Sequence, residues 1–208
     1  MKDVVRRRIG LYGGSFDPPH LGHVITITAV LNSGLVDEVW LVPSGLHRDK
    51  EMHATDANRH VMIEIMLSTS FGSKVPVKLD TIQLHDSSRV STTIELIRAE
   101  KHRFKDCEFS VVIGSDLLPQ LPKWYQAKDL LSETHFLVMP RPGHDLPKKM
   151  PPYASAIISD GLATSNISSS LVRRLIADRK SLEGIVPPAV INHIIRYKLY
   201  GYDSQPHP

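Results

Sequence analysis

Short apolar runs alternate along the chain with longer stretches in which hydrophobic residues recur every three or four positions. Six runs have the length of buried strands, namely 9–12, 36–42, 75–79, 109–113, 134–139 and, at a sheet edge, 154–158. Helical spacing covers 21–32, 56–69 and 188–200, and further helices start at 91 or 92 and after the serines at 168–170. The first strand, helix and strand predict a parallel pair with a right-handed crossover. We expect one α/β domain over residues 1–208, with 203–208 as a disordered tail.

The first predicted strand runs into two glycines, Gly13 and Gly14, which are expected to end it. A proline-stiffened turn then leads to His20 and His23 at the start of a helix. Glycines let a ligand approach the backbone, and a helix N-terminus attracts anions. Because ligands of open α/β sheets bind at strand carboxyl ends, this stretch indicates a phosphate site. A metal site on His-x-x-His and a plain turn with two exposed histidines are the alternatives.

Residues 13–23 resemble the Gly-Gly-x-Phe-Asp-Pro-x-His-x-Gly-His motif of the nucleotidylyltransferase superfamily, with every defining position present. They look most like the nicotinate and nicotinamide mononucleotide adenylyltransferases. A second stretch, 167–173, resembles the family's Ile-Ser-Ser-Thr-x-x-Arg, with Ser170 in place of the threonine. The resemblance implies a Rossmann-like nucleotidylyltransferase fold with a doubly wound, mostly parallel sheet. It also implies adenylyl transfer, in which a mononucleotide phosphate attacks the α-phosphorus of ATP and pyrophosphate leaves.

Composition narrows the classes of protein that remain. The formal net charge is only +3, and the basic residues are not gathered in one stripe, so a nucleic-acid module is disfavoured. Cys107 is the one cysteine, which excludes an internal disulfide and suits a reducing compartment. Its place beside an apolar run predicts a thiol at the edge of the core. With no apolar run near membrane-spanning length, we expect a soluble, cytoplasmic protein without a membrane partner.

Three further positions follow predicted strands or lie close to one. Asp116, in Gly114-Ser115-Asp116, can accept hydrogen bonds from ribose hydroxyls, and the family carries the same tripeptide in contact with nucleotide. Arg141 follows the strand 134–139, where it can pair with phosphate, and the family has a similar Arg-Pro-Gly. Trp124 is either a core residue or a flat face for stacking on a base or pyridine. Nicotinate-specific members of the family place a tryptophan at this distance.

The resemblance assigns roles residue by residue. The expected catalytic residues are His20, His23 and Arg173. The expected ATP-binding residues are Gly13, Gly14, Ser15, Phe16, Gly114, Asp116, Ile167, Ser168, Ser169 and Ser170. The expected mononucleotide-binding residues are Lys50, Thr93, Trp124 and Arg141. Mg²⁺ is expected to bridge the ATP phosphates, held by them and by water, with no metal ligand from the protein.

Other signals are local. Gly34 is predicted to cap the helix 21–32, and Asp56 to be the N-cap of the helix 56–69. The family places an arginine near Arg59, with a structural role or a role in binding the preceding loop. The polar stretch 44–54 follows a predicted strand, so it can hold binding residues, and a solvated surface loop is the alternative. Ser168 to Ser170 can donate to a phosphate, and a pure helix cap is the alternative.

Two departures from the family bear on the substrate. The usual Pro-His-Lys corresponds here to Leu46 to Lys50, and the usual Ser-Tyr-Thr to Ser88-Arg89-Val90 ahead of Thr93. Nicotinate mononucleotide is the expected substrate, and nicotinamide mononucleotide, as main or dual substrate, is the alternative. A non-catalytic nucleotide sensor is a second alternative, although it would predict erosion of the motif residues, and none is eroded. The sequence does not indicate an oligomeric state.

Overall fold

A six-stranded sheet forms the centre of the computed structural model, which describes residues 6–45, 51–85, 92–158 and 163–202. Its strands are β1 (Arg7–Gly14), β2 (Glu38–Pro43), β3 (Val77–Leu79), β4 (Cys107–Gly114), β5 (His135–Met139) and β6 (Ala154–Ala156). All five pairings are parallel, in the order β3-β2-β1-β4-β5-β6. This is the doubly wound Rossmann order, so the predicted fold class is confirmed and the sheet is wholly parallel.

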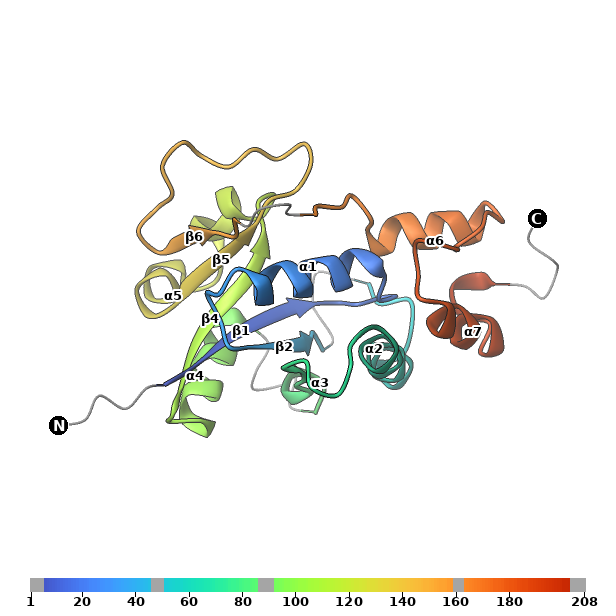
Figure 1. Cartoon of the computed structure of the whole chain (residues 1–208), viewed down its shortest axis with the longest axis horizontal. Helices are drawn as coiled ribbons and strands as arrows, with labels where there is room; N and C mark the ends of the chain where they lie inside the picture. The colour runs from blue at the N-terminus through green and yellow to red at the C-terminus, as the bar shows by residue number, and fades with distance from the viewer. Residues whose placement is uncertain (1–5, 46–50, 86–91, 159–162, 203–208) are drawn as a thin grey trace.

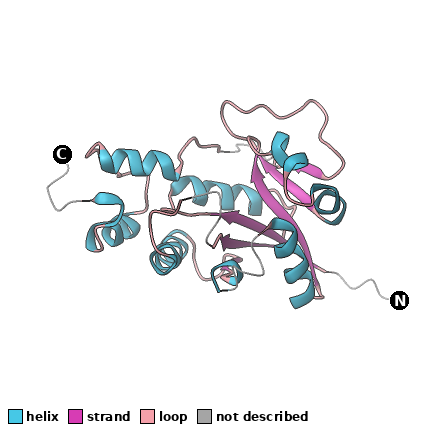
Figure 2. Ribbon diagram, turned by 180° about the vertical axis from the view of Figure 1, so that it is seen from behind, coloured by secondary structure: helices cyan, strands magenta, loops and turns pink. Residues whose placement is uncertain are grey.

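Helices cover both faces of the sheet and lie beyond its carboxyl ends (Figures 1 and 2). They are α1 (Leu21–Asn32), α2 (Asp56–Ser70), α3 (Ile82–His85), α4 (Thr93–Arg103), α5 (Ala127–Glu133), α6 (Ser169–Ala177) and α7 (Pro188–Arg196). Two 3₁₀ turns, η1 (Leu118–Lys123) and η2 (Leu199–Gly201), complete the described elements. Among the described residues, no helix is both long enough and apolar enough to cross a membrane.

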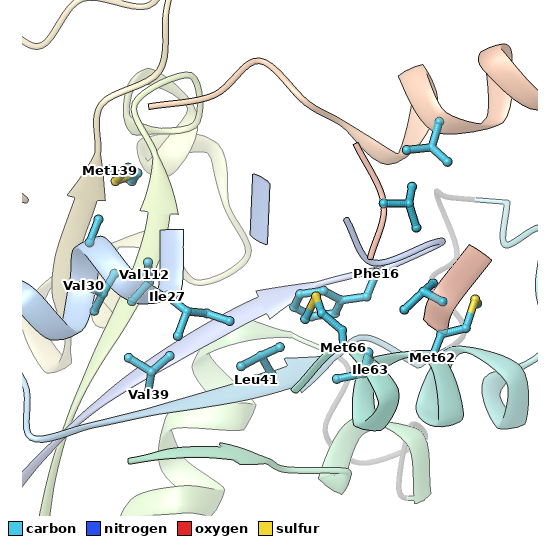
Figure 3. Close-up of a cluster of buried hydrophobic side chains, with 14 of the residues drawn as sticks. Phe16, Ile27, Val30, Val39, Leu41, Met62, Ile63, Met66, Val112 and Met139 are labelled. Carbon is cyan, nitrogen blue, oxygen red and sulfur yellow. The ribbon is translucent and has the colours of Figure 1, made fainter. Parts of the chain in front are cut away.

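The central stretches of β1, β2, β4 and β5 are mainly apolar because both of their faces are buried, while charged residues such as Arg7, Lys78 and Glu108 lie at exposed positions of the sheet. One cluster joins the sheet to α1, α2, α6 and α7, and Figure 3 shows Phe16, Ile27, Leu41 and Met66 within it. The other cluster joins the opposite face to α4, α5 and η1. Cys107 is buried at the start of β4, as predicted.

Several boundaries differ from the predictions for local reasons. β1 extends through Gly13 and Gly14, which pair with β2 opposite Val42 and Pro43, and the strand ends at Gly14 rather than before the glycines. Thr55, not Asp56, caps α2, because its hydroxyl accepts the Asn58 N–H. The predicted helix 188–200 ends at Arg196, since Lys198 and Tyr200 take positive φ values of 49° and 59°. Gly34 has φ 68° just after α1, as predicted for a helix end.

A buried acidic group makes stability depend on pH. Asp80, after β3, and Glu100, on α4, share the guanidinium of Arg103, whose Nη1 lies 3.2 Å from Asp80 and 2.5 Å from Glu100. Burial, and next the Asp80 carboxylate, raise the pKa of Glu100 from 4.5 to about 7, against the opposing charge of Arg103. The folded protein therefore keeps this proton at a pH where the unfolded chain has released it.

We expect the contribution of Glu100 to the free energy of unfolding to be fully present below pH 4.5 and to be lost as the pH rises towards 7. One pKa unit corresponds to about 1.4 kcal/mol, and solvent around the half-exposed Arg103 screens part of this, so the expected fall is about 1–3 kcal/mol. Urea unfolding of wild type and Glu100→Gln between pH 4.5 and 8 measures it. Glutamine cannot titrate, so an unchanged pH slope in the variant would contradict this account.

Candidate active site

The residues of the two motifs, together with Gly114, Asp116 and Arg141, lie where the strand order reverses, between β1 and β4. The chain leaves β1 towards α1 on one face and leaves β4 towards η1 on the other. In open α/β sheets the ligand crevice lies at the carboxyl ends of two such strands. Gly14 and Gly114 are the last residues of these two strands. The start of α6 reaches the same place, since its side chains contact the turn after β1.

The turn after β1 is shaped by Phe16, whose φ is 47° and whose ring lies in the core. A Cβ on Gly14 would lie 3.3 Å from that ring, which explains the glycine before the turn. Phe16 was predicted to bind ATP, and its buried ring leaves only its backbone for that. Arg59, fully buried on α2, donates to the carbonyl oxygens of Ser15 at 2.8 Å and Ser44 at 2.7 Å. Arg59 thus ties together the loop that follows β1 and the loop that follows β2, a structural role that the resemblance implied.

His20 and His23 form a stacked pair at the start of α1. Their ring centroids lie 3.7 Å apart with 23° between the planes. His20 is 4% exposed, so the alternative of two exposed histidines is wrong. The His20 N–H donates to Nδ1 of His23 at 3.1 Å, which leaves the proton of a neutral His23 ring on Nε2.

Burial keeps both rings neutral. It lowers the pKa of His20 to about 3, with the Arg141 charge as a smaller cause. Burial also lowers the pKa of His23 far below its ordinary value, followed by the effects of His20 and Arg141. Neutral imidazoles at neutral pH can donate through N–H groups to an anionic ligand without carrying charge themselves.

Gly22 lets the segment that precedes α6 come close to this pair. A Cβ at Gly22 would lie 3.0 Å from Cε1 and Nδ1 of His20 and 3.1 Å from the carbonyl oxygen of Ile167. The two sequence motifs therefore touch directly at this glycine. Ile167 was predicted to bind ATP, and it is the Ile167 backbone carbonyl that lies at this contact.

The start of α6 clamps the turn after β1. Ser169 Oγ donates to the Pro18 carbonyl at 2.9 Å, and Arg173 Nη1 donates to the Asp17 carbonyl at 2.6 Å. Ser168 caps the helix by accepting the N–H of Leu171. Ser170 accepts from Arg173 Nη2 at 3.3 Å. Capping is thus not the only contact of these serines, because Ser168 caps the helix while Ser169 contacts the first motif.

Asp116 and Arg141 pair with each other, which the sequence did not indicate. Arg141 Nη1 lies 3.3 and 3.2 Å from the two carboxylate oxygens of Asp116. Ser115 fixes the two loops, donating to the His144 carbonyl at 2.7 Å and accepting the Arg141 N–H at 2.9 Å. Asp116 follows β4 and Arg141 follows β5, and these two strands are neighbours in the sheet. Knowledge of the strand order would therefore have predicted that the two side chains lie close together.

Only some of the residues predicted to bind the mononucleotide belong to the described part of the chain. Thr93 begins α4, capped by Thr92, and Trp124 follows η1 on the same face of the sheet. Trp124 packs edge-on against Phe136 with centroids 6.3 Å apart, so part of its surface belongs to the core. Lys50 and the stretch 88–90 lie outside the described residues. Within the described residues, no group of three or more His, Cys, Asp or Glu side chains is placed to hold a metal.

Comparison with known proteins agrees with this arrangement. A sequence model of cytidylyltransferase-like proteins matches residues 11–175, which include both motifs. The chain belongs to the cytidylyltransferase-like family. The resemblance to the mononucleotide adenylyltransferases is confirmed, and this cytidylyltransferase-like chain is a nucleotidyltransferase enzyme.

Relatives of this cytidylyltransferase-like chain match it along nearly their whole length. A Bacillus licheniformis protein named "Probable nicotinate-nucleotide adenylyltransferase" is 31% identical, over 93% of this chain and 98% of its own. The nicotinate-nucleotide adenylyltransferase of Bacillus subtilis is 26% identical over the same shares. Plasmodium falciparum nicotinic acid mononucleotide adenylyltransferase, solved with NaAD, shares the fold at a TM-score of 0.81 and 24% identity, covering 96% of this chain and 100% of that one.

Proposed function

We propose that the protein transfers the adenylyl group of ATP to nicotinate mononucleotide, forming deamido-NAD and pyrophosphate in NAD biosynthesis. The observation that carries the proposal is the stacked pair of neutral histidines, His20 and His23, at the reversal of strand order, next to a turn that Arg173 of α6 holds through the Asp17 carbonyl. The names of the two Bacillus relatives support the choice of substrate.

The proposed reaction begins with an attacking group that is already an anion. A phosphate oxygen of the mononucleotide forms a bond to the α-phosphorus of ATP. The bond from that phosphorus to the bridging oxygen breaks, and pyrophosphate leaves with the electron pair. No general base is required, so catalysis rests on orientation and on stabilisation of the charge that moves to the leaving group.

The side chains and backbone groups at this site can supply that orientation and charge stabilisation. His23 would donate its Nε2–H to a phosphate oxygen, with His20 beside it, and Arg173 would supply positive charge from α6. The N-terminal N–H groups of α6, behind Ser168, favour the β- and γ-phosphates. Gly13, Gly14 and Ser15 would present backbone to the nucleotide, while the paired Asp116 and Arg141 would border it.

ATP would enter this site as its magnesium complex. The donors described here are imidazole rings, guanidinium groups and helix N–H groups, which suit anions. Of the described carboxylates, Asp17 is engaged by backbone N–H groups and Asp116 by Arg141. Mg²⁺ would therefore be held by phosphate oxygens and water, as is common for this ion.

Pyrophosphate release in the presence of ATP and Mg²⁺ tests the choice of substrate. We expect kcat/KM with nicotinate mononucleotide to exceed that with nicotinamide mononucleotide by at least about tenfold, a difference of about 1.4 kcal/mol. Equal values would favour dual use. ATP binding without pyrophosphate release from either would favour the nucleotide sensor.

The remaining sequence predictions are kept as part of the proposal. The partners are ATP and a pyridine mononucleotide, with neither nucleic acid nor membrane, and the location is the cytoplasm. Lys50, Thr93, Trp124 and Arg141 are assigned to the mononucleotide by resemblance.

A further inference from the structure

Tyr200 links the C-terminal end of the described chain to the turn that carries the histidines. Its hydroxyl donates to Oδ1 of Asp17 at 2.8 Å, across 183 positions of sequence. Lys198 and Tyr200 both have positive φ, and this backbone reversal after α7 directs the ring back towards the sheet. Such φ values are unfavourable in non-glycine residues, so surrounding contacts must hold them.

Asp17 is the point where four segments of the chain meet. Its carboxylate accepts the backbone N–H groups of His53 at 2.7 Å and Ala54 at 3.1 Å, just before α2. Its carbonyl accepts Arg173 of α6 at 2.6 Å, and Tyr200 adds a donor from η2. The Asp17 side chain is 2% exposed, so these donors replace the water that a carboxylate would otherwise bind.

The Tyr200 hydroxyl is a permanent donor. Burial, and next the charge of Asp17, raise the pKa of Tyr200 well above its ordinary value, because ionisation would place two negative charges side by side. The hydroxyl therefore keeps its proton at any pH of practical interest. The Asp17 carboxylate can act only as the acceptor in this contact.

We propose that Tyr200 is a positioning residue for the transfer reaction, acting through Asp17 on the turn that sets His20, His23 and Arg173. The proposal rests on the proposed function, since it concerns the rate of that reaction. Two residues separate Asp17 from His20, and both are prolines with restricted backbone torsions. A displacement of the Asp17 backbone is therefore expected to displace the two histidines as well. The same shift moves the carbonyl that holds Arg173.

Tyr200→Phe tests this with little change in packing. We expect kcat to fall on the order of tenfold, as for loss of one hydrogen bond to a charged group, with KM for ATP within about twofold. Tyr197→Phe is the matched control, because Tyr197 is 52% exposed and lies just after α7, outside the Asp17 network. Thermal unfolding of both variants separates a loss of folded protein from a loss of rate.

A double-mutant cycle asks whether Tyr200 acts through Asp17. In an Asp17→Asn background, removal of the Tyr200 hydroxyl should change kcat by less than about twofold, since the contact is already weakened. Additive effects on kcat would contradict the proposal. An unchanged kcat in the single Tyr200→Phe variant would also overturn it.

Imidazole nitrogen NMR supplies a readout that does not depend on activity. We expect Tyr200→Phe to shift the ring signals of His20 and His23 and to leave those of His135 on β5 unchanged. If wild type forms no pyrophosphate, the proposed function fails, while these signals still test the linkage. Unshifted His20 and His23 signals would overturn the positioning role even if the wild-type enzyme is active.

Discussion

His23→Ala is expected to lower kcat for adenylyl transfer by about a hundredfold or more, with KM for ATP little changed. The ring of His23 is fixed by the His20 N–H on Nδ1, which leaves its Nε2–H as a donor. Loss of a fixed donor to developing charge costs on the order of 10²–10³ in kcat. Steady-state pyrophosphate release measures the change.

Two matched variants decide whether donation is the cause. His23→Gln keeps an N–H donor on a flexible chain and should retain more activity than His23→Ala. His102→Ala removes an exposed histidine from the last turn of α4 and should leave kcat unchanged. A correctly folded His23→Ala variant with wild-type turnover would remove His23 from the mechanism.

Gly114→Ala is expected to lower kcat/KM for ATP by about thirty- to a hundredfold. Its added Cβ would lie 2.3 Å from Oδ1 of Asp116 and 2.6 Å from Cδ of Arg141, closer than atoms can approach. The new methyl group must displace the ion pair that borders the crevice. Kinetics over a range of ATP concentrations, with thermal unfolding in parallel, measure the loss.

Gly72→Ala is the control for the effect of replacing a glycine by alanine where no neighbour is displaced. Its Cβ would meet nothing within 4 Å, so we expect wild-type kinetics. If Gly114→Ala kept its kcat/KM, the position of the Asp116 and Arg141 pair would have no bearing on nucleotide use.

The sequence predicted the sheet well because the central strands β1, β2, β4 and β5 contain short apolar runs that are buried. It placed Gly14, Gly114 and Arg141 at strand ends, and a parallel sheet brings such ends to one edge. It missed η1 and α5, whose short turns give too few residues for a helical period to emerge. The pairing of Asp116 with Arg141 needs the strand order, which no local pattern contains.

The contacts that hold the site together are mostly long-range and polar. Arg173 to Asp17 spans 156 positions and Tyr200 to Asp17 spans 183, and both depend on the docking of α6 and η2. Hydrophobic periodicity cannot predict a hydrogen bond between a carboxylate and a distant hydroxyl. Family resemblance assigned Arg173 to the ATP phosphates, and the structure adds its contact with the turn of the first motif.

Transfer of label from ATP tests the central claim most directly. With ATP carrying ³²P at the α-phosphorus, nicotinate mononucleotide and Mg²⁺, the protein should move the label into deamido-NAD, with one unlabelled pyrophosphate released for each dinucleotide formed. Label that remains in ATP, or that appears only as AMP or ADP, would contradict adenylyl transfer to the mononucleotide.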